Sequence, residues 1–431
     1  MSEISDSFRA GRFAKLRDIL ARRRGLLKDY LSAISGSGGR LVFSLLYFVA
    51  LANALSIADF GLFATASAAG VMLSRILAFG FVSQLYRIAT VRPRLIGVFT
   101  AGFLLLSLLS LPFLAAASWA AFALFFAGSM PAGAFATVIV AEALLGRPNE
   151  LVMIVNNGMG RFGRAATLAI ISSVIRAAAA VIFIAMPASG LTGWTLLYLA
   201  ANGASLAVAI LFYYPRQALV LKAGIYFKRL PDALYVAGAE VLFYLQMELD
   251  KLLVLAIGGA QLAGIYAIIM RLVDLTAIPI RAFTMMLVQK LMRTPEMLAR
   301  LLVRAGIEGG IFAVSTLALL CLAVILHFFP GALGRNVAEA APLVGLAIMV
   351  PGLRNLVEYQ AELLFGRGQM FLRALNLALL AGIKAGLLIW LLGHVSDTHE
   401  LVLWLNPVFA AIYLASALLT YSELRLPAKT I

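Results

Sequence analysis

Charged residues and cysteine are both scarce in this sequence. Only 13% of the 431 residues are charged, roughly half the fraction found in soluble globular proteins. The single cysteine, Cys321, excludes an intrachain disulfide. Hydrophobic residues make up 63% of the chain and the mean hydropathy is +0.98. The sequence therefore predicts an all-α polytopic membrane protein.

The sequence also lacks features that ATP hydrolysis and membrane-embedded glycan synthesis require. The chain has no P-loop for ATP hydrolysis, so any energy would come from an H+ or Na+ gradient or from the gradient of a substrate, and no cofactor is expected. Three histidines are present, His327, His394 and His399. In the HVSDTHE segment a solvated turn is favoured over a metal site. No long extracytoplasmic loop is predicted, which disfavours a membrane-embedded polysaccharide polymerase or glycosyltransferase.

The long apolar runs allow about twelve transmembrane helices at about 20 residues per crossing. A basic connection divides these helices into two lobes of about six each. The predicted organisation is a basic amphipathic segment at 1–29, an N-terminal lobe at 30–213, a linker at 214–231, a C-terminal lobe at 232–421 and a tail at 422–431.

The net charge of +15 has a pattern that argues against nucleic-acid binding. Lysine and arginine gather in alternate connections between the apolar runs, as expected when positive loops stay in the cytoplasm. Of the connections on the other side, only the one with Arg335 carries a basic residue. Both termini are therefore predicted to be cytoplasmic, and residues 1–29 are suited to lie on an anionic lipid surface.

The stretch 231–281 contains two apolar runs that are interrupted by charges. A charged side chain near the bilayer centre costs about 3 kcal/mol, so it usually faces a protein interior or a watery cavity. At helical spacing, the polar residues of each run share one face. The face of the first run contains Glu240, Tyr244, Met247 and Lys251, and the face of the second run contains Arg271, Asp274 and Arg281. The hairpin thus predicts one wall of a central hydrated cavity, and the rest of the chain would build the other walls.

A weak internal repeat links the two halves. Gly61 and Phe63 follow the first span, and Gly264 and Tyr266 occupy the matching places after the seventh. The two hairpins read ALSIADFGLFATASAAGVMLSRI and LDKLLVLAIGGAQLAGIYAIIMRLVDL. They resemble the corresponding hairpins of Wzx-type lipid-linked oligosaccharide flippases, in the multidrug/oligosaccharidyl-lipid/polysaccharide (MOP) superfamily. The family pattern of an acidic residue before a Gly-x-aromatic step is matched by Asp59 and by Asp250, and Arg271 follows the second step.

This resemblance implies a MATE-like pair of six-helix lobes in a bacterial inner membrane, opening alternately to either leaflet. The implied cargo is an undecaprenyl-diphosphate-linked glycan, and the implied partners are membrane lipids and the polysaccharide polymerase and export machinery. Two alternatives stay open. One is a cation-coupled multidrug exporter of the same superfamily, and the other is a membrane-embedded polymerase or glycosyltransferase.

A diphosphate carries at least two negative charges, and buried arginine or lysine would replace its lost water with charge-assisted hydrogen bonds. Arg40, Arg75 and Arg176 have no acidic residue within four positions of their own helix, so we expect them to face substrate rather than a structural partner. The candidate substrate residues are Arg40, Arg75, Arg176, Lys251, Arg271 and Arg281.

The acidic residues of the second half are the candidates for ion coupling. Glu240, Asp250 and Asp274 would respond to a proton or to Na+. At an i, i+4 spacing, Arg354 and Glu358 are expected to form a structural ion pair. Arg281 and Asp274, seven positions apart, could pair in the same way.

Overall fold

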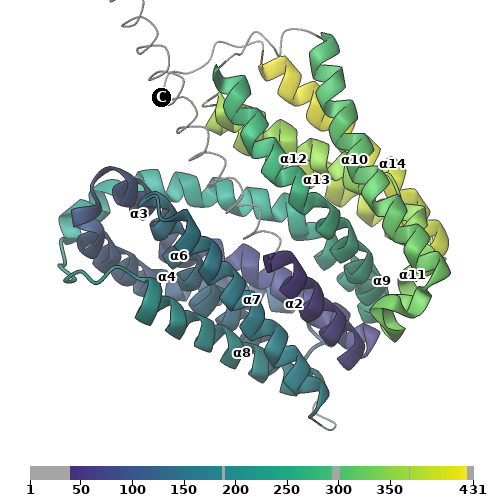
Figure 1. Cartoon of the computed structure of the whole chain (residues 1–431), viewed down its shortest axis with the longest axis horizontal. Coiled ribbons are helices and arrows are strands. Elements are labelled where there is room, and N and C mark those ends of the chain that lie inside the picture. The colour runs from purple at the N-terminus through teal and green to yellow at the C-terminus, as the bar shows by residue number, and fades with distance from the viewer. Residues whose placement is uncertain (1–38, 187–189, 294–300, 368, 425–431) are drawn as a thin grey trace, which may run out of the picture.

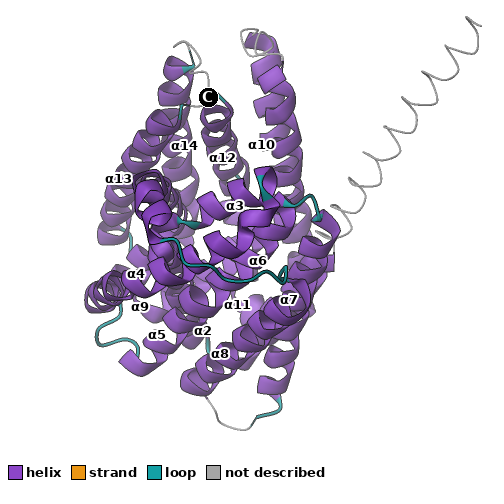
Figure 2. Ribbon diagram, turned by 90° about the vertical axis from the view of Figure 1, so that its left-hand side faces the viewer, coloured by secondary structure: helices purple, strands orange, loops and turns teal. Residues whose placement is uncertain are grey.

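The computed structural model describes residues 39–186, 190–293, 301–367 and 369–424. Within these ranges the chain forms helices and no strand, and short loops join the helices (Figure 2). The all-α prediction is therefore confirmed. The segment predicted as amphipathic, 1–29, lies outside the described residues, as does most of the predicted tail.

The first bundle contains the helices up to residue 213 (Figure 1). It begins with the helix Gly39–Ala54. The helices that follow are α2 (Ile57–Leu73), η1 (Ser74–Gly80), α3 (Val82–Val91), η2 (Pro93–Leu95), α4 (Ile96–Phe125), α5 (Ala132–Ile139), η3 (Val140–Gly146), α6 (Arg147–Gly158), α7 (Phe162–Ile184), α8 (Gly190–Val208) and η4 (Ala209–Tyr213).

The second bundle contains most of α9 and the helices that follow it. The elements are α9 (Ala223–Arg293), α10 (Leu301–Phe328), η6 (Pro330–Leu333), α11 (Arg335–Val344), η7 (Gly345–Ala347), α12 (Val350–Gly366), α13 (Met370–His394) and α14 (Thr398–Glu423). We call the two bundles the N-lobe and the C-lobe.

Eight helices of the described chain are long and apolar enough to cross a membrane, or nine if the pair Arg335–Ala347 and Val350–Leu364, bent by 67°, is one span. The helix Gly39–Ala54 is apolar but short, and the continuous helix α5–α6 carries several charged residues. Left-handed Gly259 (φ +80°) breaks α9 where the sequence predicts the turn between two spans. Each of the twelve predicted spans therefore has a helical counterpart.

Helix α9 joins the lobes. In Figure 1 it runs from the N-lobe into the C-lobe, and it packs most extensively against α2 of the N-lobe and α13 of the C-lobe. Its first part lies on the N-lobe, where the Tyr226 hydroxyl donates to the Val98 carbonyl at 2.8 Å. Ala233 and Ala237, beyond the predicted linker, pack closely on Gly80 of the N-lobe, so packing crosses the lobe boundary that we placed at residue 232.

The two glycines of the sequence repeat meet each other where α2 crosses the second half of α9. A Cβ atom on Gly61 would lie 2.4 Å from the Gly264 nitrogen, and one on Gly264 would lie 2.0 Å from the Ile57 carbonyl oxygen. The two backbones are therefore as close as helices can pack. The weak repeat that was visible in the sequence marks the contact between the lobes.

Two asparagines, Asn53 and Asn336, also join the lobes. The Asn336 side chain donates to the carbonyls of Ala52 and Leu55 at 2.6 and 2.7 Å. The Asn53 side chain donates to the Leu333 carbonyl at 2.9 Å and accepts from the Asn336 backbone N–H at 3.3 Å. These bonds satisfy carbonyls at the end of the first helix that would otherwise lack partners, and they hold α11 against the N-lobe.

Gly264→Ala should destabilise the protein because the new methyl group has no space at the crossing. We expect the free energy of unfolding to fall by about 1–3 kcal/mol, as for other overpacked cores. Thermal unfolding of the purified protein measures this. The matched control is Gly382→Ala in α13, where a Cβ meets nothing within 4 Å and the helix should be slightly stabilised. Equal melting of the two variants would contradict the close crossing.

Candidate functional site

Four charged residues of the α9 hairpin, Glu248, Lys251, Arg271 and Asp274, line two adjoining cavities. The larger, of about 410 Å³, lies between the two halves of α9 and α12. The smaller, of about 250 Å³, lies between α9 and the first two helices of the N-lobe. Glu248 and Asp274 line both cavities, so the two cavities adjoin, and the smaller one lies between α9 and the N-lobe. The central cavity predicted from the hairpin is therefore present.

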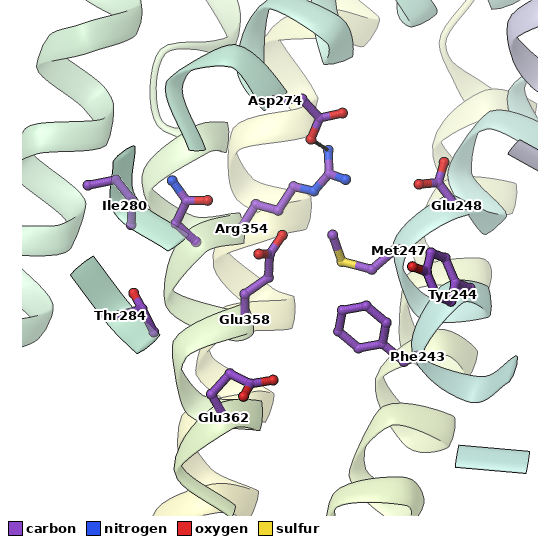
Figure 3. Close-up of a pocket in the computed structure, with 11 residues that line it drawn as sticks. Phe243, Tyr244, Met247, Glu248, Asp274, Ile280, Thr284, Arg354, Glu358 and Glu362 are labelled. Carbon is purple, nitrogen blue, oxygen red and sulfur yellow. Dashed lines mark ion pairs between the residues drawn. The ribbon is translucent and has the colours of Figure 1, made fainter. Parts of the chain in front are cut away.

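In the larger cavity, the Arg354 guanidinium reaches across from α12 to Asp274 of α9 (Figure 3). The closest nitrogen and oxygen atoms of this ion pair are 3.3 Å apart. Glu358 and Glu362 line the cavity further along α12 (Figure 3). Arg354 thus forms an ion pair with Asp274 on another helix, while Glu358, four residues along its own helix, acts on it electrostatically.

Two basic residues of α9, Lys251 and Arg271, line the smaller cavity. Lys251 forms an ion pair with Glu248 at an i, i+3 spacing. Arg271 donates to the Ser44 hydroxyl on the first N-lobe helix. In the described chain no carboxylate lies within ion-pair distance of Arg271, although it shares the cavity with Asp274. Arg271 is thus a guanidinium at the lobe interface whose hydrogen-bond partner is neutral.

Asp250 is sealed away from these cavities. Its side chain is 0% exposed and lies 3.2 Å from the Lys384 ammonium, which is itself 2% exposed. The Tyr266 hydroxyl donates to the other Asp250 oxygen at 2.6 Å, and Lys384 also donates to the Gln246 carbonyl at 2.8 Å. This arrangement binds α9 to α13. It argues against Asp250 as a coupling group, because an ion would have to displace a buried lysine.

Arg75 has partners on other helices. Its Nη1 donates to both Glu150 oxygens at 3.1 and 2.9 Å, and its Nη2 donates to the Tyr244 hydroxyl at 3.2 Å. Arg147, which we did not select from the sequence, donates to Glu150 at 2.9 Å and to Glu240 at 2.8 Å. The expectation that Arg75 lacks a structural partner was therefore wrong, because it considered only the residues of its own helix.

The remaining candidates are Arg176, Arg40 and Arg281. Arg176 donates to the Ser172 carbonyl of its own helix at 3.3 Å and lies within electrostatic reach of Glu142. Arg40 is exposed in the first turn of its helix and acts electrostatically on Glu150. The side chain of Arg281 lies outside the described part of the chain.

The fold is similar to that of known transporters. No family model and no curated protein matches the sequence significantly. A multidrug resistance MATE family transporter of the MOP superfamily, inward-facing, superposes with a TM-score of 0.68 at 13% identity, over 92% of this chain and 98% of that chain. An outward-facing multidrug resistance MATE family transporter of the MOP superfamily superposes with a TM-score of 0.61 at 14% identity, over 91% of this chain and 95% of that chain. The chain has the MATE transporter fold.

A third structure shows that this fold is used with different pockets. A MOP superfamily transporter from Pyrococcus furiosus Vc1, whose binding pocket is described as having reverse polarity, superposes with a TM-score of 0.60 at 14% identity, over 92% of this chain and 95% of that chain. With identities this low the MATE likeness concerns the fold alone. The choice of substrate has to be argued from the residues of the cavity.

Lys384→Met should strongly destabilise the fold because it leaves the Asp250 carboxylate buried without a counter-charge. We expect a loss of about 3–5 kcal/mol in the free energy of unfolding, and the double variant Asp250→Asn/Lys384→Met should recover most of it. Thermal unfolding is the measurement. The control is Lys251→Met, whose partner Glu248 faces the cavity and stays accessible to water. If both lysine variants melt alike, Asp250 is not sealed.

Proposed function

We propose that this protein is a flippase that moves an undecaprenyl-diphosphate-linked oligosaccharide from the cytoplasmic to the extracytoplasmic leaflet by alternating access. The observation that carries the proposal is Arg271. It lines the cavity between the lobes, and its hydrogen-bond partner is a serine hydroxyl rather than a carboxylate. A guanidinium in this state can accept a phosphate without first losing an ion pair.

The composition of the cavity supports an amphipathic, hydroxyl-rich cargo. Cationic donors and carboxylate acceptors are both present on the walls, and sugar hydroxyl groups need both kinds of partner. Tyr47, Phe60 and Phe63 add aromatic surface on the N-lobe side. The polysaccharide polymerase and export machinery, membrane lipids and a bacterial inner membrane with both termini in the cytoplasm follow as parts of the same proposal.

Alternating access is supported by how the lobes are joined. The Asn53–Asn336 contacts and the Gly61–Gly264 crossing tie the lobes together at neighbouring N-lobe segments, 52–55 and 57–61. The similarity is greater to the inward-facing MATE structure than to the outward-facing one. In this proposal the asparagine contacts close the outer end and break when the cavity opens outward.

A second candidate is a cation-coupled multidrug exporter. The larger cavity is lined by four carboxylates, Glu248, Asp274, Glu358 and Glu362, with Arg354 as its basic residue. Such a lining favours a cationic drug or a coupling ion. Glu240 and Asp274 remain in our proposal as the groups that respond to H+ or Na+, since both are partly exposed. The polymerase and glycosyltransferase alternatives gain no support, since the similar structures are transporters.

Arg271→Ala should reduce glycan export at least about tenfold, because a charge-assisted hydrogen bond contributes about 1.5–3 kcal/mol. The test uses cells in which the gene is deleted and a plasmid copy restores it. It measures surface polysaccharide together with undecaprenyl-linked glycan retained on the inner leaflet. Arg271→Lys should retain part of the activity.

The matched control is Arg94→Ala, which removes an exposed arginine remote from the cavity and should leave export unchanged at equal protein level. Wild-type export by Arg271→Ala would contradict the flippase proposal. Loss of drug resistance in Asp274→Asn, with glycan export intact in every variant, would favour the exporter.

A further inference from the structure

Two arginines of the N-lobe hold two carboxylates side by side. The Glu150 Oε2 atom accepts from Arg75 Nη1 and from Arg147 Nη1, each at 2.9 Å. The Glu240 Oε2 atom accepts from Arg147 Nη2 at 2.8 Å and lies 3.9 Å from Arg75 Nη1. Two adjacent anionic groups are therefore bound by the same pair of guanidiniums, which is the arrangement that a diphosphate would require.

Burial differs between the two halves of this cluster. The side chains of Arg75 and Arg147 are 6% and 1% exposed, whereas those of Glu150 and Glu240 are each 35% exposed. The guanidiniums therefore form the floor and the carboxylates form the open side. The Nε–H groups of Arg75 and Arg147 are buried and have no hydrogen-bond partner, so the binding capacity of the arginines exceeds what the carboxylates use.

The surroundings add positive charge. Arg40 acts electrostatically on Glu150, and Arg373, which is also paired with Glu362 at 2.9 Å, acts on Glu240. The Arg75 guanidinium carbon lies over the Tyr244 ring, 4.3 Å from the ring centroid. Tyr244 also lines the larger cavity (Figure 3). The cluster therefore adjoins the space between the lobes, in a field that favours a ligand with at least two negative charges.

The same region carries strained backbone. Ala78 and Phe79 have left-handed φ values of 54° and 51°, and Gly80 follows at 72°. Left-handed residues other than glycine carry steric strain and gather at functional sites. A Cβ on Gly80 would lie 2.6 Å from the Ala233 carbonyl oxygen, so this strained turn packs closely against the first part of α9. Glu240 lies on that same part of α9 and holds it to the N-lobe.

We infer that this cluster is a diphosphate site that the protein's own carboxylates occupy in the absence of ligand. A diphosphate takes the places of the Glu150 and Glu240 carboxylates on Arg75 and Arg147. Loss of the Glu240 contacts removes the ion pairs that hold the first part of α9 to the N-lobe and leaves the Tyr226–Val98 hydrogen bond, so that this part of α9 can pivot and headgroup binding is coupled to movement between the lobes. The inference rests on the proposed function in taking the diphosphate to be that of the lipid-linked cargo.

The test uses the purified full-length protein with inorganic pyrophosphate as the probe and orthophosphate as the comparison. Pyrophosphate affinity is measured by calorimetry. Glu240→Gln keeps the shape of the side chain but removes the competing charge, so it should bind pyrophosphate at least about tenfold more tightly. Arg147→Gln should bind it at least about tenfold more weakly. Arg147→Lys, which keeps the charge and loses the paired geometry, should lie between wild type and Arg147→Gln.

Movement of α9 is measured by pulsed electron paramagnetic resonance in a Cys321→Ser background. Spin labels at Arg87→Cys in α3 and Asp232→Cys in α9 occupy exposed positions and should move apart when pyrophosphate binds. The control pair, Arg87→Cys with Phe162→Cys in α7, lies within the N-lobe and should keep its distance. Glu240→Gln should shift the first pair towards the longer distance even without ligand.

Equal pyrophosphate affinity in wild type, Glu240→Gln and Arg147→Gln would overturn the inference, and so would binding that leaves the Arg87–Asp232 distance unchanged. The proposed function fails separately. If pyrophosphate binds and moves α9 as described but no lipid-linked glycan is transported, the diphosphate site stands and the flippase proposal falls. If glycan transport persists in Arg147→Gln without a change in pyrophosphate affinity, the site falls and the flippase proposal stands.

Discussion

The high free energy of a charge within the bilayer is the constraint on which this structure depends. An ionised side chain in a spanning helix has to meet a partner or a polar space. The charged side chains of this protein meet that requirement in three ways. Lys384 and Asp250 bind each other in a sealed pair, Arg75 and Arg147 share two carboxylates across helices, and Arg271 faces the space between the lobes. Stability and function therefore use the same class of residue.

The sequence predicted the fold well and the partners within the site poorly. Apolar runs define spans through composition alone, and the matched glycines Gly61 and Gly264 marked the lobe contact because only glycine permits so close a crossing. Ion pairs are different. Helical spacing reveals partners three or four residues apart, whereas Arg75 meets Glu150 across 75 positions and Arg147 meets Glu240 across 93. Such pairs depend on tertiary packing.

Helix α9 connects these features. Its first part lies on the N-lobe through Tyr226 and Glu240, and its next turns bind α13 through Asp250. After the break at Gly259 it crosses α2 at the Gly61–Gly264 contact. A single helix thus carries a contact to the N-lobe, a contact to the C-lobe and the crossing between them.

Transport by the purified protein in lipid vesicles tests the central claim most directly. Vesicles loaded on one leaflet with an undecaprenyl-diphosphate oligosaccharide are probed with a membrane-impermeant sugar-binding protein that reads the other leaflet. Our account predicts that the glycan becomes accessible at a rate that depends on the protein and falls at least about tenfold in Arg271→Ala. Accessibility no faster than in protein-free vesicles, with efflux of a cationic drug from the same preparation, would contradict it.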